Sequence, residues 1–109
     1  LRIREELAWD PLPKVLLGDF NDVPGSLMHR AVRSRLVDVF KLAGEGRGGT
    51  FPLVPKLVTP RIDYIFASPE LTPTHAKVIR TRASDHHILT AEVEVRAARV
   101  HERQLASGA

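Results

Sequence analysis

The sequence has no cysteine and only one tryptophan, one tyrosine and one methionine among its 109 residues. The lack of cysteine excludes a disulfide framework and a thiolate metal site. No apolar run approaches the roughly 20 residues that a membrane-spanning helix needs, so we expect a soluble chain, of open localisation. The composition, 43% hydrophobic and 27% charged, is that of one ordinary globular domain. The net charge of +3 favours an anionic partner only weakly, because a solvated surface explains it equally well.

The two ends of the sequence carry helical patterns. Residues 1–9 have the periodicity of an amphipathic helix, but no capping residue precedes Leu1. We therefore expect the chain to be a piece of something longer. The tail, residues 96–109, is helix-prone and is expected to fray after Val95.

Four β-strands are predicted from the apolar pattern, at residues 14–18, 61–68, 74–80 and 88–95. The first contains three consecutive apolar residues, as in a strand that is buried on both faces. The second alternates, with Ile62, Tyr64 and Phe66 on one side and Asp63 on the other. The third carries charged and apolar residues on one side, which predicts an edge position. The fourth alternates regularly between inside and outside.

Proline and glycine divide the remaining sequence. Pro24-Gly25-Ser26 predicts the start of a helix capped by Ser26 or Asp22, with an apolar inner side formed by Leu27, Met28, Ala31, Val32 and Leu36. The glycine-rich segment 44–49 lacks the spacing of a phosphate-binding loop and is interpreted as a plain linker. Residues 69–73 predict a turn, and 81–87 a polar loop. His29, His75 and His101 are expected to be ordinary surface or partly buried residues.

Polar clusters follow or open three of these strands: Asp19 with Asn21, Asp63 behind Arg61, and Asp85 with His86. Each cluster alone has a plain structural explanation. The first fits a turn with side-chain hydrogen bonds, the second an Arg61–Asp63 ion pair, and the third a surface loop. Their combination, in this order, favours a shared functional site.

The same motifs identify a family resemblance. Gly18-Asp19-Phe20-Asn21-x-x-Pro24, Thr50-Phe51-Pro52, Arg61-Ile62-Asp63-Tyr64-Ile65-Phe66 and Ser84-Asp85-His86 resemble the endonuclease/exonuclease/phosphatase superfamily, also called DNase I-like. The resemblance covers residues 1–95 and corresponds to the C-terminal half of that family's domain. It implies an α/β fold: half of a four-layer α/β/β/α sandwich, with one mainly antiparallel or mixed sheet and helices on one face.

The resemblance also implies roles for individual residues in metal-dependent phosphoester hydrolysis. Asp19 matches the residue that orients or deprotonates the attacking water, and Asn21 the amide that contacts the phosphate. His86 matches the histidine that stabilises charge in the transition state, and Asp63 the carboxylate bonded to it. Asp85, with Asp19, matches the acidic metal site, and Arg61 is assigned to substrate binding. His87 is interpreted as structural or solvent-exposed.

The resemblance implies Mg²⁺ or Mn²⁺ as cofactor, together with a glutamate from the family's N-terminal half. No residue of this sequence matches that glutamate, so the chain alone is expected to be inactive or nearly so. Its inner sheet face would otherwise meet water, which predicts pairing with the missing half or with a second copy. The substrate is a phosphoester, with DNA, RNA, inositol phosphates and lipid headgroups all open.

Two other functions stay open. One is a non-catalytic module that binds nucleic acid or phosphate through Arg30, Arg33, Arg61, Arg80 and Arg82, with salt-steep binding that needs no metal. Few aromatic residues and three acidic clusters argue against it. The other is a degenerate scaffold, which the joint presence of the five polar site residues argues against.

Overall fold

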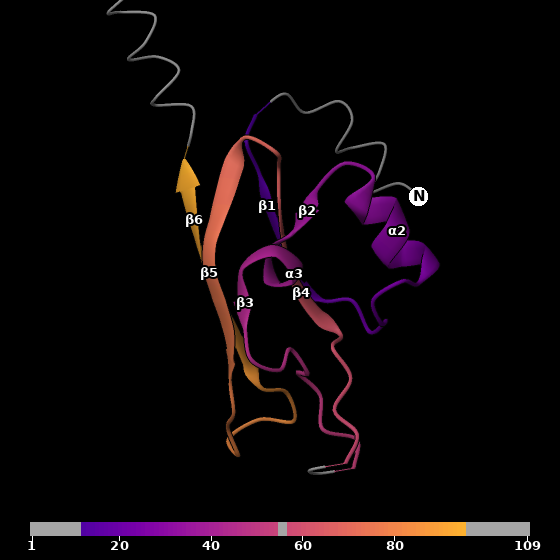
Figure 1. The fold of residues 1–109 in the computed structure, drawn as a ribbon. Helices are drawn as coiled ribbons and strands as arrows, with labels where there is room; N and C mark the ends of the chain where they lie inside the picture. The colour runs from indigo at the N-terminus through magenta and orange to yellow at the C-terminus, as the bar shows by residue number, and fades with distance from the viewer. Residues whose placement is uncertain (1–11, 55–56, 96–109) are drawn as a thin grey trace, which may run out of the picture.

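In a computed structural model, described here for residues 12–54 and 57–95, the chain forms two short helices and six strands (Figure 1). The expected helix at 1–9 and the tail at 96–109 lie outside the described residues. The elements follow in the order β1 (Val15–Asp19), α2 (Leu27–Arg33), β2 (Val37–Asp38), α3 (Val39–Ala43), β3 (Gly44–Glu45), β4 (Asp63–Ala67), β5 (Leu71–Ile79) and β6 (Ile88–Val95). Neither described helix is long and apolar enough to cross a bilayer.

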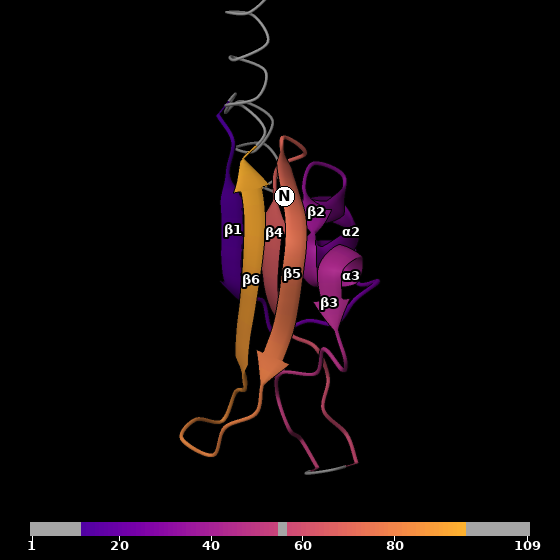
Figure 2. The same cartoon turned by 60° about the vertical axis from the view of Figure 1, so that its left-hand side comes forward.

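The strands form two sheets of three strands each, ordered β1-β4-β2 and β3-β5-β6. The first sheet is antiparallel throughout, whereas β3 runs parallel to β5 and β5 antiparallel to β6. Figures 1 and 2 show the β5–β6 pair lying over one face of β4. The mixed α/β class is confirmed, but the hydrogen bonds divide the strands between two sheets where one was expected.

Strand β4 lies at the centre of the packing because both of its faces are covered. On one face, Tyr64 and Phe66 pack against Val32 and Leu36, which α2 and the residues after it supply. On the other face, Ala67 joins a second core that includes residues of α3, β5 and β6: Val39, Leu71, Ala76, Ala91 and Val93. The predicted alternation of Ile62, Tyr64 and Phe66 toward one buried side is confirmed.

Strand β1 departs from its prediction. Leu17 is 66% exposed and Val15 45%, so the strand is not buried on both faces. Leu17 is the register partner of Ile65, and both border a hollow of about 170 Å³ that also touches Leu89 on β6. Within the described part of the chain, β5 and β6 cover β4 and leave this face of β1 open. The expectation of a wholly uncovered inner face is therefore wrong for β4 and right for β1.

Three further expectations need correction. Strand β5 is longer than predicted and central in its sheet, because β3 pairs with it on one side and β6 on the other. The glycine-rich segment is not a plain linker, since it contains β3 and since Gly49 packs so closely that a Cβ there would collide with the carbonyl of Thr59. Leu27 is exposed, because it opens α2 on the side away from β4. The bounds of β6 are as predicted.

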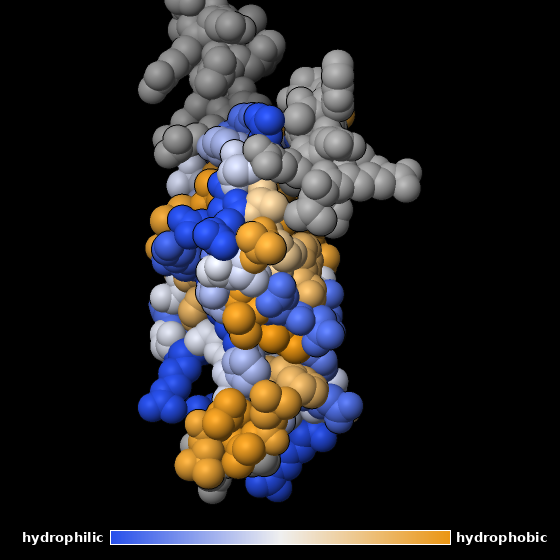
Figure 3. All heavy atoms as spheres, turned by 90° about the vertical axis from the view of Figure 1, so that its right-hand side faces the viewer, coloured by the Kyte–Doolittle hydropathy of each residue, from blue (hydrophilic) through white to orange (hydrophobic). Residues whose placement is uncertain are grey.

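The segment from Thr50 to Pro60 extends beyond the sheets as a narrow loop. Its backbone is tied at the base by bonds from the Thr50 and Phe51 N–H groups to the Pro60 carbonyl, and Val54 bridges Val58. Four apolar side chains near its tip are exposed, and Figure 3 shows apolar atoms gathered at that end of the molecule: Leu53, Val54, Leu57 and Val58. The base of this loop supports the site described next.

Candidate active site

Asp19 is the last residue of β1 and is followed by a tight turn. Gly18 has a φ of 149°, and Asn21 has a φ of 50°, in the left-handed region that asparagine tolerates better than most residues. The Asn21 N–H donates to Asp19 Oδ1 at 2.8 Å, and the Phe20 N–H donates to the Ile62 carbonyl at 2.9 Å. These bonds fix the Asp19 carboxylate at the end of the first sheet.

Asp63 is the first residue of β4 and the register partner of Asp19. Its backbone N–H donates to Thr50 Oγ1 at 3.1 Å, and the Ile62 N–H donates to the same oxygen at 3.2 Å. Thr50 is fully buried. A threonine from the long loop thus fixes the start of β4, a role that we did not predict for the Thr50-Phe51-Pro52 motif.

His86 comes from the loop before β6, and the same Thr50 holds that loop. The His87 N–H donates to the Thr50 carbonyl at 2.6 Å, while the Phe51 ring centre lies 4.8 Å from that of His86. The His87 ring accepts a bond from the Thr81 N–H, so His87 stabilises the loop's own fold. Thr50 therefore links the strand that carries Asp63 to the loop that carries His86.

The three side chains meet at one end of the first sheet. His86 Nδ1 lies 2.7 Å from Asp63 Oδ2, and His86 Nε2 lies 3.6 Å from Asp19 Oδ2. The hydrogen bond to Asp63, with the negative charges of Asp63, Asp19 and Asp85, outweighs partial burial and raises the pKa of His86. The pair fixes the ring orientation, favours its cationic form and leaves Nε2 directed toward Asp19.

These groups can also contribute to a metal site. Ligand atoms of Asp19, Asp63 and His86 all lie within 4.8 Å of one another. Carboxylate oxygens are the ligands that Mg²⁺ prefers, with water and substrate oxygens in the remaining positions. His86 is committed to Asp63 through Nδ1, so the donor chemistry fits a cation held mainly by carboxylate oxygen.

The structure brings together some of the predicted residues and leaves others apart. Asp19, Asp63 and His86 converge, and Asn21 joins them through its backbone. Asp85 is exposed and does not belong to the ligand group that the described residues form. Arg61 is bound elsewhere: its guanidinium donates two hydrogen bonds to Asp38, at 2.9 and 2.6 Å. The geometry therefore gives Arg61 a different partner from the Asp63 that the sequence suggested, and its substrate role stays a prediction.

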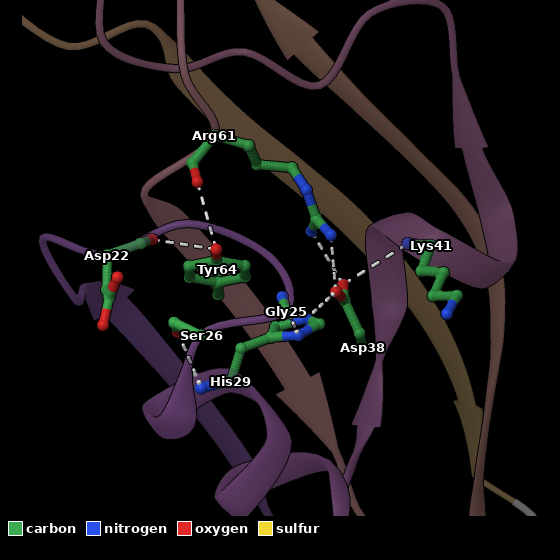
Figure 4. A network of polar contacts seen from close by, with 8 residues as sticks. All are labelled: Asp22, Gly25, Ser26, His29, Asp38, Lys41, Arg61 and Tyr64. Carbon is green, nitrogen blue, oxygen red and sulfur yellow. Dashed lines mark hydrogen bonds and ion pairs between the residues drawn. The ribbon is translucent and has the colours of Figure 1, made fainter.

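We did not predict a second polar cluster, which is buried between α2 and β4 (Figure 4). Asp38 and His29 are each only 2% exposed and bond to one another at 2.8 Å. The expectation that His29 is an ordinary surface or partly buried residue is therefore wrong. A signal was present, because Asp38 lies in the apolar run Val37–Phe40 and a buried carboxylate needs a partner.

Comparisons with known proteins agree on one family. The model described as "Endonuclease/Exonuclease/phosphatase family" matches residues 1–86. No curated protein matches the sequence. A solved structure of a functionally unknown conserved protein from Enterococcus faecalis is 30% identical with a TM-score of 0.75, covering 85% of this chain and 41% of its own.

Two more solved structures carry the family's name. The protein from Leptotrichia buccalis is 28% identical with a TM-score of 0.68, covering 84% of this chain and 40% of its own. The protein from Bacteroides vulgatus is 26% identical with a TM-score of 0.68, covering 76% and 36%. The chain thus spans well under half the length of the structures it matches.

Proposed function

The chain belongs to the endonuclease/exonuclease/phosphatase family, and on that premise we propose that it contributes to metal-dependent hydrolysis of phosphoester bonds. The family contains hydrolytic enzymes and is generally dependent on divalent metals. The observation that carries the proposal is the convergence of Asp19, Asp63 and His86 from two strands and a loop. Hydrolysis of a phosphoester needs an oriented water and positive charge near the phosphoryl oxygens, and these groups supply both.

We assign the roles as follows. Asp19 orients the attacking water or accepts its proton. His86, whose cationic form Asp63 favours, stabilises the negative charge that develops on the phosphoryl oxygens. Asp63 holds the imidazole through the 2.7 Å bond and keeps its Nε2 facing the reaction. The Asn21 amide contacts a phosphoryl oxygen, at a position fixed by the bond from its N–H to Asp19.

The proposed cofactor is Mg²⁺ or Mn²⁺, which when bound supplies charge to polarise the phosphoryl oxygen. Asp19 would contribute to holding it, with Asp63 within reach and Asp85 as a more distant carboxylate. Water and substrate oxygens would fill the remaining positions around the cation. We infer that a further ligand, a glutamate by family resemblance, comes from another polypeptide segment.

We infer that this other segment is also a binding partner of the chain. Val15 and Leu17 are exposed on β1, Leu17 borders the hollow beside Leu89, and both β1 and β6 end their sheets among the described residues. We propose that a segment corresponding to the unmatched part of the relatives, or a second copy of this chain, covers this face. The substrate class is a phosphoester, including nucleic acids. No contact among residues 12–54 and 57–95 favours the alternative of a metal-free binding module.

The proposal is tested with the 109-residue chain and bis(p-nitrophenyl) phosphate in Mg²⁺ or Mn²⁺. The chain is also joined to the unmatched part of the Leptotrichia buccalis protein. We expect the joined protein to hydrolyse the diester only with metal, and Asp19→Asn and His86→Ala to reduce turnover about 10²-fold or more. The chain alone is expected to be nearly inactive and to bind Mn²⁺ weakly.

Two outcomes would contradict these proposals separately. Hydrolysis that survives chelation, or that neither substitution reduces, would overturn the assignment of metal-dependent catalysis to this site. Turnover by the chain alone that equals that of the joined protein would overturn the need for a second segment. Thr74→Ala, in the middle of β5, is the control because this exposed side chain lies outside the proposed site.

A further inference from the structure

The buried cluster between α2 and β4 contacts the turn that follows Asp19 at two points. We propose that His29, Asp38, Arg61 and Tyr64 are positioning residues, which hold the turn from Asp22 to Gly25 and thereby keep Asn21 in its left-handed conformation beside Asp19. The inference rests on the proposed function only where it predicts that loss of these residues weakens metal binding beside Asp19. The conformational part stands on the contacts in Figure 4.

Asp38 is the centre of this cluster. It accepts two hydrogen bonds from Arg61 and one from His29 Nε2, and its Oδ1 also accepts a 3.3 Å bond from the Lys41 N–H at the start of α3. All four bonds converge on a side chain that is 1% exposed. A buried carboxylate with this many donors has a single favourable geometry, so it fixes both Arg61 and His29.

His29 provides the first link to the turn. Its Nδ1 accepts a 3.0 Å hydrogen bond from the Gly25 N–H, while its Nε2 faces Asp38 at 2.8 Å. A ring nitrogen that accepts from an amide carries no proton, so the hydrogen-bond network assigns the Nε2–H tautomer to His29. One imidazole therefore transmits the position of Asp38 to the backbone at Gly25.

Tyr64 provides the second link. Its hydroxyl lies 2.9 Å from the Asp22 carbonyl and 3.0 Å from the Arg61 carbonyl, and it shares one proton between these acceptors. The ring is 1% exposed, and the Arg61 guanidinium carbon lies 4.9 Å from its centre. Arg61 thus contacts Tyr64 through its backbone and its side chain, while binding Asp38.

The turn needs such support because its own hydrogen bonds are only short-range, from the Val23 N–H to Asp22 Oδ1 and from the Ser26 N–H to the Val23 carbonyl. Asn21, Val23, Pro24 and Gly25 are exposed, and Asn21 has a positive φ that costs free energy in a residue other than glycine. Such conformations persist where the surrounding structure determines them. Tyr64 holds the Asp22 carbonyl, which is one residue after Asn21, and His29 holds the Gly25 N–H. The two contacts thus lie on either side of Val23 and Pro24.

The experiment uses nuclear magnetic resonance on the ¹⁵N-labelled 109-residue chain. Tyr64→Phe removes only the hydroxyl, and His29→Phe keeps a ring but loses both nitrogen contacts. We expect both variants to shift or broaden the amide signals of residues 21–25 and to change the Asn21 coupling constant that reports φ. Mn²⁺ affinity is expected to fall about tenfold or more, since residues that support metal ligands commonly matter to this degree.

Val32→Ala is the matched control, because Val32 is buried in the same layer and makes no polar contact with the turn. It should lower the unfolding temperature and leave the signals of residues 21–25 unchanged. Unchanged turn signals in folded Tyr64→Phe would overturn the proposal, whatever happens to His29→Phe. Changed signals with unchanged Mn²⁺ affinity would overturn its metal-site consequence. A wild-type chain that binds no Mn²⁺ would instead contradict the weak metal binding proposed for this chain, and the turn signals would still decide the conformational part.

Discussion

Asp19 and Asp63 face one another as register partners across the β1–β4 pair. Two carboxylates directly opposite on neighbouring strands repel each other, so this pairing destabilises the sheet unless a cation intervenes. The His86 ring lies 2.7 Å from the Asp63 carboxylate and 3.6 Å from the Asp19 carboxylate. The arrangement therefore concentrates negative charge at a point where either an imidazolium or a metal ion offsets it.

The first prediction concerns the ionisation of His86. The bond to Asp63 raises the pKa of His86, so its ring signals should titrate at a higher pH than those of an exposed histidine. Asp63→Asn should move the midpoint down, and Asp85→Asn should move it less. Proton resonances followed from pH 5 to 9 give both values. A midpoint that Asp63→Asn leaves unchanged would contradict the pairing.

The raised pKa of His86 also makes the stability of the folded chain depend on pH. The folded-state pKa of His86 is raised, so the stabilisation from the His86–Asp63 pair is complete below the ordinary histidine value. It is lost as pH rises through the folded-state pKa. The difference in unfolding temperature between wild type and Asp63→Asn should therefore narrow from pH 6 toward pH 9.

The second prediction concerns Tyr64, the single tyrosine of the sequence. Burial and the nearby negative charges of Asp38 and Asp22 outweigh Arg61 and raise the pKa of Tyr64 to about 12. Ultraviolet absorbance of the native chain should therefore show phenolate only near this pH, and the unfolded chain should show it near pH 10. Stability from the protonated hydroxyl is complete below pH 10 and is lost as pH rises toward 12. Native titration near pH 10 would contradict the burial of the Tyr64 hydroxyl.

The third prediction concerns the Asp38–Arg61 pair. Burial alone would raise the pKa of Asp38, but hydrogen bonds from Arg61 and His29 hold this pKa below its ordinary value. Asp38→Asn leaves the guanidinium without its charged partner and should cost about 3–5 kcal/mol of unfolding free energy at pH 7. Asp85→Asn makes the same change at an exposed position and should cost less than about 0.5 kcal/mol.

Denaturant unfolding at several pH values checks this prediction. Because the pKa of Asp38 is lowered, its contribution is present above the ordinary aspartate value and is lost as pH falls through the folded-state value. The gap between wild type and Asp38→Asn should therefore shrink below about pH 4. A gap that is constant across this range would show that the charge of Asp38 does not provide the stability.

The fourth prediction concerns Gly49. A Cβ at this position would collide with the Thr59 carbonyl and the Thr59 methyl group, so Gly49→Ala must move backbone at the base of the loop. We expect a loss of about 1–3 kcal/mol, as for other overpacked sites, measured by denaturant unfolding. Lys77→Ala, exposed on β5, should change stability by less than about 0.5 kcal/mol. A neutral Gly49→Ala would show that this contact is not tight.

Residues whose surroundings are local could be predicted from the sequence. The alternation of Ile62, Tyr64 and Phe66 predicted which side of β4 carries the buried aromatic residues, and Ser26 caps α2 as expected, accepting a bond from the His29 N–H. The order of the Asp19, Asp63 and His86 motifs predicted one shared site. These features depend on the periodicity of the side chains, on capping chemistry and on a specific order of motifs, all of which can be seen in the sequence.

Tertiary structure alone decided the rest. The division into two sheets, the exposure of Leu17 and the partner of Arg61 depend on which strands pair over long distances. Asp38 lies 23 positions before Arg61 in the sequence, and nothing local distinguishes it from Asp63 as the partner. Packing determines which aspartate pairs with Arg61: Asp38 is buried and requires the guanidinium, whereas Asp63 is partly exposed and bonds to His86.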